Sequence, residues 1–292
     1  MINNQQIKKY WSEGYTIVRN LIPHYLIDQF INEFDSVKYH QNIKVHRMDS
    51  QTKDKLEIDQ SGRLLNPIAD IHLSRYYDKC LENLNNKALD VLSCSELLSV
   101  LGKIHSADSL TLVMSMFFDM NKGTPPHQDS YYLDTMPAGN LTASWIAFED
   151  IHEEAGRFYV SPNSNSLFLE LTTEEIINSD LYENIIGDLI SKGELEIISP
   201  ELKKGDVLFW NSNTVHGSHK SKNKKFSRKS FTAHFIPNDK TTKLVQNKYL
   251  PNERNYDFFE KNNLRFRITN SIKETLSTSL KTRSLDSFKN NQ

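Results

Sequence analysis

Three residues in this chain have the types and the spacing of a metal site. His127 and Asp129 lie two positions apart in TPPHQDSYY, and His216 follows a strand-like segment in GDVLFWNSNTVHGS. On an extended backbone residues i and i+2 point to the same side, so the imidazole of His127 and the carboxylate of Asp129 can converge on one ion. Two histidines and one carboxylate form a facial triad, which leaves positions open for other ligands and O₂ on Fe(II). The alternative for His216 is a cap on a hairpin.

An arginine follows His216 at the start of the next strand-like segment. Arg228 opens RKSFTAHFIP, in which alternate residues from Arg228 to His234 share one polar face and the phenylalanines share the other. An arginine at the head of such a face can bind a carboxylate through two parallel hydrogen bonds. The triad and this arginine together indicate a 2-oxo acid cosubstrate, with Lys229 as a rival anchor.

Short segments rich in β-branched and aromatic residues would position these side chains. They are separated by Gly, Pro, Asn and Asp, which is typical of strands and turns. The predicted strands cover residues 111–120, 141–150, 156–162, 195–200, 205–211 and 228–237. In the first of them Met114, Met116 and Phe118 share one face, which we interpret as a pocket wall.

Helical patterns surround the predicted strands. The opening thirty-odd residues predict helix, strand and helix, and apolar residues recur at helical spacing between positions 66 and 101. The segment 39–62 is polar and predicts an irregular loop. A helical insert is predicted over 172–190, with a capped start at Thr172 or Thr173 with Glu175. Strands behind a helical layer favour a β-sandwich or barrel backed by helices.

The composition excludes several classes of protein. The 292 residues include 35 basic and 37 acidic side chains, so the net charge of -2 argues against a nucleic-acid or anionic-membrane binder. Two cysteines cannot form a disulfide framework or a cysteine zinc site, so a metal must be held by His and carboxylate. Because the N-terminus lacks a signal-like apolar run and no segment is long enough to span a membrane, we expect a cytoplasmic protein.

In their order along the chain these motifs resemble one family. HQDSYY, SWIAFEDIHEEAGRFYVSPNSN and GDVLFWNSNTVHGS with its following arginine are similar to the phytanoyl-CoA dioxygenase (PhyH-like) family of Fe(II)/2-oxoglutarate-dependent oxygenases, over roughly residues 8–237. The resemblance implies a mostly β fold with flanking helices and a double-stranded β-helix, a jelly-roll or cupin-like core. We expect a single catalytic domain over 1–292. Its parts would be a helix and strand layer (1–107), the core with its insert (108–240) and a C-terminal extension (241–292).

The resemblance also assigns roles to residues. His127, Asp129 and His216 would be the catalytic iron ligands, and Arg228 would pair with the C5 carboxylate of 2-oxoglutarate. Residues that would contribute to cosubstrate binding beside Arg228 are Ser218, Trp145 and Gln128. Candidate substrate contacts are Tyr131, Tyr132, Arg157 and His234.

The function implied is that of a non-haem iron oxygenase with 2-oxoglutarate and O₂ as cosubstrates. It would hydroxylate, or otherwise oxidise, a C–H bond of a small-molecule metabolite and release succinate and CO₂. The substrate stays open among acyl-CoA thioesters, amino acids, phosphonates and natural-product intermediates, as does the choice between monomer and homodimer. The alternatives are a non-catalytic relative that binds 2-oxoglutarate or metal, and a cupin-like metal hydrolase or isomerase, which would not need Arg228.

Overall fold

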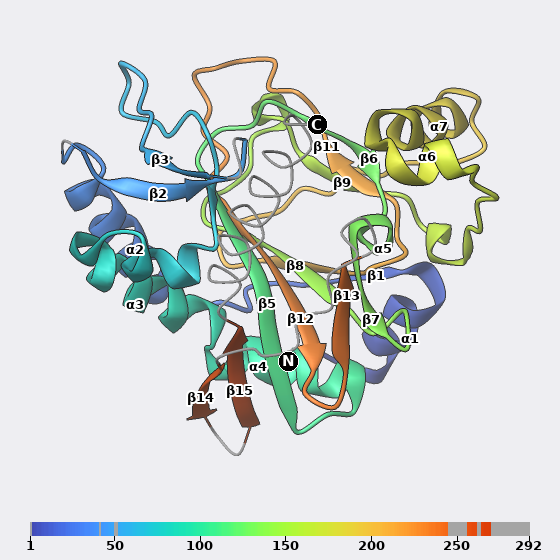
Figure 1. Cartoon of the computed structure of the whole chain (residues 1–292), viewed down its shortest axis with the longest axis horizontal. Helices are drawn as coiled ribbons and strands as arrows, with labels where there is room; N and C mark the ends of the chain where they lie inside the picture. Colours follow the sequence, from blue (N-terminus) through green and yellow to red (C-terminus); the bar gives the residue numbers. More distant parts are fainter. Residues whose placement is uncertain (1, 41, 50–51, 245–255, 262–263, 270–292) are drawn as a thin grey trace, which may run out of the picture.

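A large and mostly antiparallel sheet runs through the middle of the protein (Figure 1). The computed structural model describes residues 2–40, 42–49, 52–244, 256–261 and 264–269. The order of strands in this major sheet is β1 (Tyr15–Val18), β10 (Val207–Asn211), β8 (Thr142–Ala147), β12 (Ser230–Pro237), β5 (Ser109–Phe118), β4 (Ile68–Ala69), β2 (Lys44–Arg47) and β3 (Thr52–Lys55). Strand β15 (Leu264–Thr269) pairs with β5 in parallel and with β14 (Tyr256–Lys261) in antiparallel fashion.

A minor sheet faces the major one. Its order is β6 (Thr124–His127), β11 (His216–Ser218) and β9 (Phe158–Val160), and β7 (Leu133–Met136) pairs separately with β13 (Thr241–Leu244). From β5 to β12 the chain alternates between the two sheets, because β5, β8, β10 and β12 belong to the major sheet and β6, β9 and β11 to the minor one. This alternation makes a double-stranded β-helix with flanking helices, and the predicted fold is confirmed.

The two sheets enclose an aromatic core. Trp145, Leu208 and Trp210 of the major sheet pack with Phe158 and Val160 of the minor sheet. Successive residues of a strand point to opposite faces, so these side chains lie between the sheets while their neighbours in sequence lie outside. The inner face therefore consists of alternate residues from each strand.

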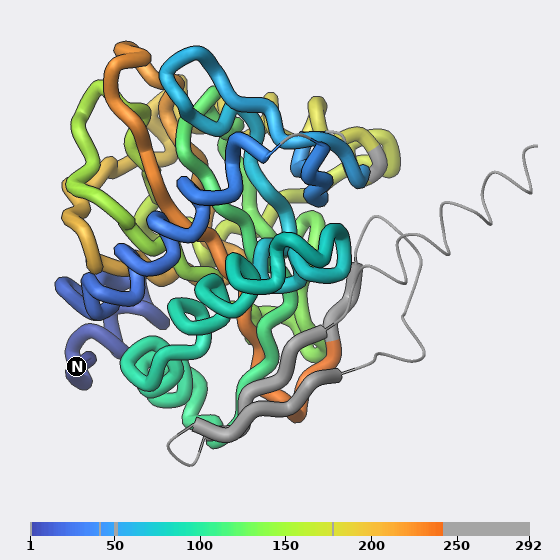
Figure 2. Tube along the Cα trace, turned by 90° about the vertical axis from the view of Figure 1, so that its left-hand side faces the viewer, coloured from blue at the N-terminus to red at the C-terminus, as the bar shows by residue number. Residues whose placement is uncertain are grey.

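The outer face of the major sheet packs against the helical layer. The helices are α1 (Asn4–Glu13), α2 (His24–Val37), α3 (Glu82–Leu92) and α4 (Ser95–His105), and Figure 2 shows them over one side of the molecule. Phe30 of α2 meets Phe117 and Phe231 edge-on at centroid distances of 5.0 and 4.7 Å. The predicted helix, strand and helix at the N-terminus are confirmed, and their apolar residues hold the sheet from outside.

Three segments differ from the sequence-based expectation. The predicted loop 39–62 contains β2 and β3, whose hydrogen bonds extend the sheet edge; all four residues of β3 are exposed, so the segment lacks an apolar alternation. Residues 195–200 form only a bridge from Ile198 to Val160. The chain after residue 66 first forms β4 and two 3₁₀ helices, η1 (Ile71–Tyr76) and η2 (Lys79–Leu81), before α3.

The helical insert agrees with its prediction. It comprises α6 (Thr173–Ile177) and α7 (Ser179–Ser191), and Thr172 and Glu175 form the expected capping box. The short elements α5 (Asp129–Tyr132), η3 (Glu153–Ala155) and η4 (Ser164–Ser166) lie in connections of the core.

Residues 270–292 of the predicted C-terminal extension fall outside the described residues, and the proposed limits at 107 and 240 stay predictions. Within the described ranges, no helix has the length and apolar character needed to cross a membrane.

One buried histidine makes the stability of this fold sensitive to acid. His72 of η1 is buried beside β5, where its Nδ1 lies 2.6 Å from Ser115 Oγ, and burial lowers its pKa from 6.5 to about 4. The unfolded chain binds a proton on His72 more tightly than the folded chain does. The contribution of neutral, buried His72 to the free energy of unfolding is therefore fully present above pH 6.5 and is lost as the pH falls below it. We expect the protein to lose about 2 kcal/mol more than His72→Gln between pH 7 and pH 5. Urea titrations at both pH values measure this difference, and equal losses would contradict it.

Candidate metal centre

The two histidines with metal-site spacing are direct cross-strand partners. His127 is the last residue of β6, His216 is the first of β11, and the two are paired in register. Directly opposed residues of antiparallel strands project to the same face with Cβ atoms about 5 Å apart. Their rings accordingly lie 4.3 Å apart between centroids.

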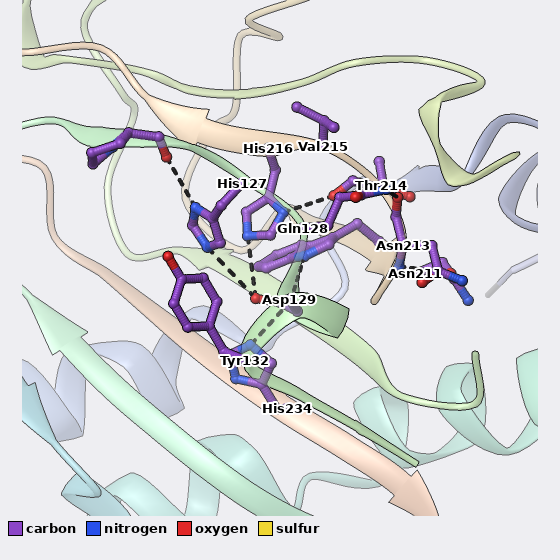
Figure 3. A network of polar contacts seen from close by, with 12 residues as sticks. His127, Gln128, Asp129, Tyr132, Asn211, Asn213, Thr214, Val215, His216 and His234 are labelled. Carbon is purple, nitrogen blue, oxygen red and sulfur yellow. Dashed lines mark hydrogen bonds and ion pairs between the residues drawn. The ribbon is translucent and has the colours of Figure 1, made fainter. Parts of the chain in front are cut away.

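The carboxylate reaches the histidines because the chain turns after Gln128. That residue is extended, with φ -107° and ψ 133°, and α5 begins at Asp129. Oδ1 of Asp129 lies 3.4 Å from Nε2 of His216 and 3.7 Å from Nε2 of His127. One donor atom from each of the three residues lies within 4.8 Å of the others, and Figure 3 shows these side chains pointing toward one another. Two imidazole nitrogens and one carboxylate oxygen in this arrangement fit a divalent transition metal.

Backbone carbonyls orient both imidazoles. Nδ1 of His127 lies 2.9 Å from the carbonyl oxygen of Pro125, and Nδ1 of His216 lies 2.9 Å from that of Thr214. Each carbonyl accepts a hydrogen bond from Nδ1–H, which leaves the lone pair of Nε2 free to bind an ion. The ring orientation that metal binding needs is thus built into the β6 and β11 segments.

The electrostatics of the cluster favour an ionised carboxylate. Burial opposes the charge of Asp129, but the neighbouring His216 and His234 outweigh burial and hold the pKa of this carboxyl well below its usual range. Burial lowers the pKa of His216. Burial also acts to lower the pKa of His127, but the nearby Asp129 carboxylate, the Pro125 carbonyl and Glu183 together outweigh it and raise that pKa. Since ligands bind metals in their deprotonated forms, Asp129 and His216 are already in the required state at neutral pH.

The helical insert braces the loop between the first two ligand candidates. Tyr182 of α7 accepts a hydrogen bond from the backbone N–H of Gln128 (3.1 Å) and donates one to Gln128 Oε1 (3.2 Å). Gln128 Nε2 in turn donates to the carbonyl oxygen of Asn213 (2.6 Å), in the loop before His216. The side chain of Gln128 therefore ties the two ligand loops together, and its role toward a cosubstrate stays a prediction.

The residues after His216 are constrained by close packing. A Cβ at Gly217 would overlap the hydroxyl of Tyr159, so only glycine fits between His216 and Ser218 without displacing that ring. Ser218 Oγ donates to Asn121 Oδ1 (3.2 Å) and lies at hydrogen-bond distance (3.0 Å) from the hydroxyl of Thr124. The hydroxyl of Ser218 is thus engaged at the start of β6, and its predicted contact with a cosubstrate stays a prediction.

Arg228 is a buried cation that has no anionic partner among the described residues. It lies directly before β12, is 2% exposed, and its Cζ is 5.2 Å from the Phe118 ring and 5.5 Å from the Trp145 ring. Nε has no hydrogen-bond partner in the described part of the chain, and burial lowers the pKa of the guanidinium to about 9. A buried charge is costly unless it is paired, so this position is suited to an anionic ligand.

Lys229, the rival anchor, points the other way. Its Nζ lies 3.3 Å from Asp119 Oδ1 and 3.5 Å from Glu149 Oε2, so its charge is already neutralised. Neighbouring residues of an extended segment face opposite sides, and here the arginine takes the side of Trp145.

A wall of sulfur and aromatic side chains continues from Arg228 toward the triad. In the register of β12 with β5, Ser230 lies opposite Phe118, Thr232 opposite Met116 and His234 opposite Met114. Figure 1 shows β5 and β12 side by side. The predicted common face of Met114, Met116 and Phe118 therefore flanks the polar face of β12.

The candidate substrate contacts separate into two groups. The ring of Tyr132 stands edge-on to His127 at a centroid distance of 5.6 Å, and its hydroxyl donates to Glu183 Oε1 at 2.7 Å. By contrast, Tyr131 stacks on Tyr182 and its hydroxyl donates to the carbonyl oxygen of Glu175. Arg157 donates from Nε to the carbonyl oxygen of Ile151. Of these three candidates, Tyr132 is the one in contact with the triad.

Two further residues approach Asp129 from the major sheet. His234 Nε2 lies 3.3 Å from Asp129 Oδ2, so this side chain contacts a ligand candidate; its predicted contact with a substrate stays a prediction. Trp210 Nε1 donates to the same Oδ2 at 2.9 Å. Sequence reasoning did not single out Trp210; the available signal was its alternation with Phe209 in the strand before His216.

Removal of one ligand candidate tests the site directly. We expect His216→Ala to weaken binding of Fe(II) or Co(II) by more than about a hundredfold, because one of three donors is lost. His219→Ala is the matched control, since His219 is exposed and bonds to Ser199 instead. Anaerobic metal titration measures both variants. Equal affinity of His216→Ala and the parent protein would refute the site.

Comparison with known proteins agrees with the fold and the cluster. The sequence model of the phytanoyl-CoA dioxygenase (PhyH) family matches residues 10–230. Human peroxisomal phytanoyl-CoA dioxygenase is 24% identical over 256 residues, covering 80% of this chain and 68% of the human protein. A probable phytanoyl-CoA dioxygenase of Caenorhabditis elegans is 24% identical over 251 residues, covering 82% of this chain and 77% of its own.

Solved structures share the architecture at low sequence identity. The epimerase SnoN from nogalamycin biosynthesis, crystallised with Fe³⁺, α-ketoglutarate and nogalamycin RO, is 15% identical with a TM-score of 0.60, covering 90% of this chain and 97% of SnoN. EctD from S. alaskensis, crystallised with 2-oxoglutarate and 5-hydroxyectoine, is 15% identical with a TM-score of 0.60, covering 86% of this chain and 82% of EctD. On the strength of the family match over most of its length, this chain belongs to the phytanoyl-CoA dioxygenase family.

Proposed function

We propose that this protein is an Fe(II)- and 2-oxoglutarate-dependent oxygenase that oxidises a C–H bond of a small molecule and releases succinate and CO₂. One observation carries the proposal: a buried arginine, which has no anionic partner within the described part of the chain, precedes the strand that also brings His234 to the carboxylate of the triad. A metal triad alone suits many reactions, whereas a triad together with an unpaired buried cation suits a metal-chelating dicarboxylate.

The residues of the triad would hold the iron. Nε2 of His127, Nε2 of His216 and Oδ1 of Asp129 are the donor atoms, and the carbonyls of Pro125 and Thr214 fix the two rings. When bound, Fe(II) supplies the oxidative decarboxylation of the 2-oxo acid and the oxidation of the substrate. The part of the protein is to orient the ligands and to exclude water with the aromatic core between the sheets.

Arg228 would bind the distal carboxylate of 2-oxoglutarate. Phe118 and Trp145 flank its guanidinium and keep it apart from water, which strengthens a charge-assisted hydrogen bond. Its position beside the guanidinium supports the proposal that Trp145 lines the cosubstrate pocket. Thr232 lies opposite Trp145 on the neighbouring strand, between Arg228 and His234 along the inner face.

Two alternative functions would not require all the features of this site. A hydrolase or isomerase that uses the same triad has no need of a buried arginine without a partner. A non-catalytic relative need not keep three donors, oriented rings and the arginine together. Structural relatives that were crystallised with iron and 2-oxoglutarate add support for the oxygenase.

Tyr132 is the proposed contact to the substrate. It stands beside His127 and is half-buried, and Glu183 of the helical insert fixes its hydroxyl. The insert would thus shape the substrate side of the centre. Hydroxylation as the outcome, the oligomeric state and a cytoplasmic location stay predictions.

The direct test uses the protein without its substrate. Anaerobic addition of Fe(II) and then 2-oxoglutarate should give a weak visible charge-transfer band, because the 2-oxo acid chelates the ion. In air, a panel of small molecules is then assayed for succinate release and for a product heavier by one oxygen atom. A bound metal without the band would favour the hydrolase or isomerase.

The anchor is tested through the cosubstrate. In Arg228→Ala the loss of a bidentate charge-assisted pair should raise the KM for 2-oxoglutarate by about thirtyfold to a thousandfold, or about 2 to 4 kcal/mol. Lys229→Ala is the matched control, since its charge is already paired on the other face. A large effect of Lys229→Ala with none of Arg228→Ala would transfer the role to the lysine.

A further inference from the structure

The two oxygens of Asp129 have different surroundings. Oδ1 faces the imidazoles of His127 and His216 at 3.7 and 3.4 Å, on the side of the minor sheet. Oδ2 faces the major sheet, where it accepts a hydrogen bond from Trp210 Nε1 at 2.9 Å and lies 3.3 Å from His234 Nε2. One oxygen is therefore turned toward the two candidate histidine ligands, and the other is held by the major sheet.

The residues that hold Oδ2 form one row across the major sheet. Trp210 of β10 and His234 of β12 are both register partners of Ala143, which lies between them on β8. Their rings are nearly perpendicular, with centroids 6.2 Å apart. The small side chain of Ala143 leaves room above the sheet, and the carboxylate reaches down between the indole and the imidazole. Figure 3 shows His234 directed at Asp129 from this side.

Among the described residues, Asp129 is the polar partner of both Trp210 and His234. His234 is 2% exposed, neither of its nitrogens makes an aligned hydrogen bond among the described residues, and Asp129 is its ion-pair partner. The bond from Trp210 is shorter and aligned, so it is the firmer of the two. A buried indole N–H and a buried imidazole both need a polar partner; Oδ2 accepts the hydrogen bond of the indole and faces the imidazole at 3.3 Å.

We propose that Trp210 and His234 are a positioning pair that keeps Asp129 monodentate toward the iron. A six-coordinate ion bound by two imidazoles and one carboxylate oxygen would keep three positions open, the number that a chelating 2-oxo acid and O₂ would require together. If Oδ2 were free, the carboxylate could turn and chelate the ion, which would remove one of those positions. The inference rests on the proposed function, because it concerns the same iron centre.

The test uses the Co(II)-loaded full chain and 2-oxoglutarate as the probe, with visible absorption as the readout, so that no turnover is needed. In Trp210→Phe the aromatic ring stays but the N–H is lost. We expect its Kd for 2-oxoglutarate to rise by about tenfold or more while its Co(II) affinity stays within about threefold of the parent. Trp11→Phe is the matched control, because this exposed residue also loses an indole hydrogen bond, which goes to the carbonyl of Ile104 and not to the triad.

Two variants at His234 give an independent answer should Trp210→Phe fail to fold. His234→Leu removes the polar contact and should weaken 2-oxoglutarate binding, whereas His234→Gln keeps an N–H donor and should restore it. Parent-like Kd values and spectra in Trp210→Phe and His234→Leu would overturn the positioning pair and leave the proposed function standing. No spectral response of the parent protein to 2-oxoglutarate would overturn the proposed function, and the inference with it.

Discussion

The candidate centre depends on one buried carboxylate that four aromatic rings surround. Asp129 is approached by His127 and His216 from the minor sheet and by Trp210 and His234 from the major sheet. A buried ionised carboxylate is unfavourable unless charged or hydrogen-bonding groups compensate it, and here each sheet supplies part of that compensation. The Asp129 carboxylate thus makes polar contacts with residues of both sheets at the point where the sheets face each other.

The two faces of the major sheet have different roles: the outer face packs against the helical layer, and the inner face surrounds the candidate centre. The outer face carries phenylalanines such as Phe117 and Phe231, which lock against Phe30 of the helical layer. The inner face carries the residues that surround the centre, among them Trp145 and Trp210. Side chains that must hold an ion and its ligands within a fraction of an ångström need rigid support, and the helical layer provides it from behind. The insert α7 braces the other side through Tyr182.

Much of the centre could be predicted from local spacing. Alternation along a strand places Arg228 and Lys229 on opposite faces, and the two-residue interval places His127 beside Asp129. The order of the motifs also indicated the family and its double-stranded β-helix. Where local pattern was absent, prediction was wrong: β3 is a fully exposed edge strand, so its sequence carries no apolar alternation and reads as a loop.

The sequence by itself determined which residue types are available for a metal and a carboxylate, and which side chains of one strand share a face. Only the tertiary structure decided which face points inward, because that depends on where the helices pack. It alone paired Lys229 with Asp119 and buried Arg228 where no described residue offers it an anion. It alone brought His234 and Trp210 to Asp129, residues 81 or more positions apart in the chain. Spacing constrains neighbours along a strand, whereas contacts between sheets follow from how the sheets stack.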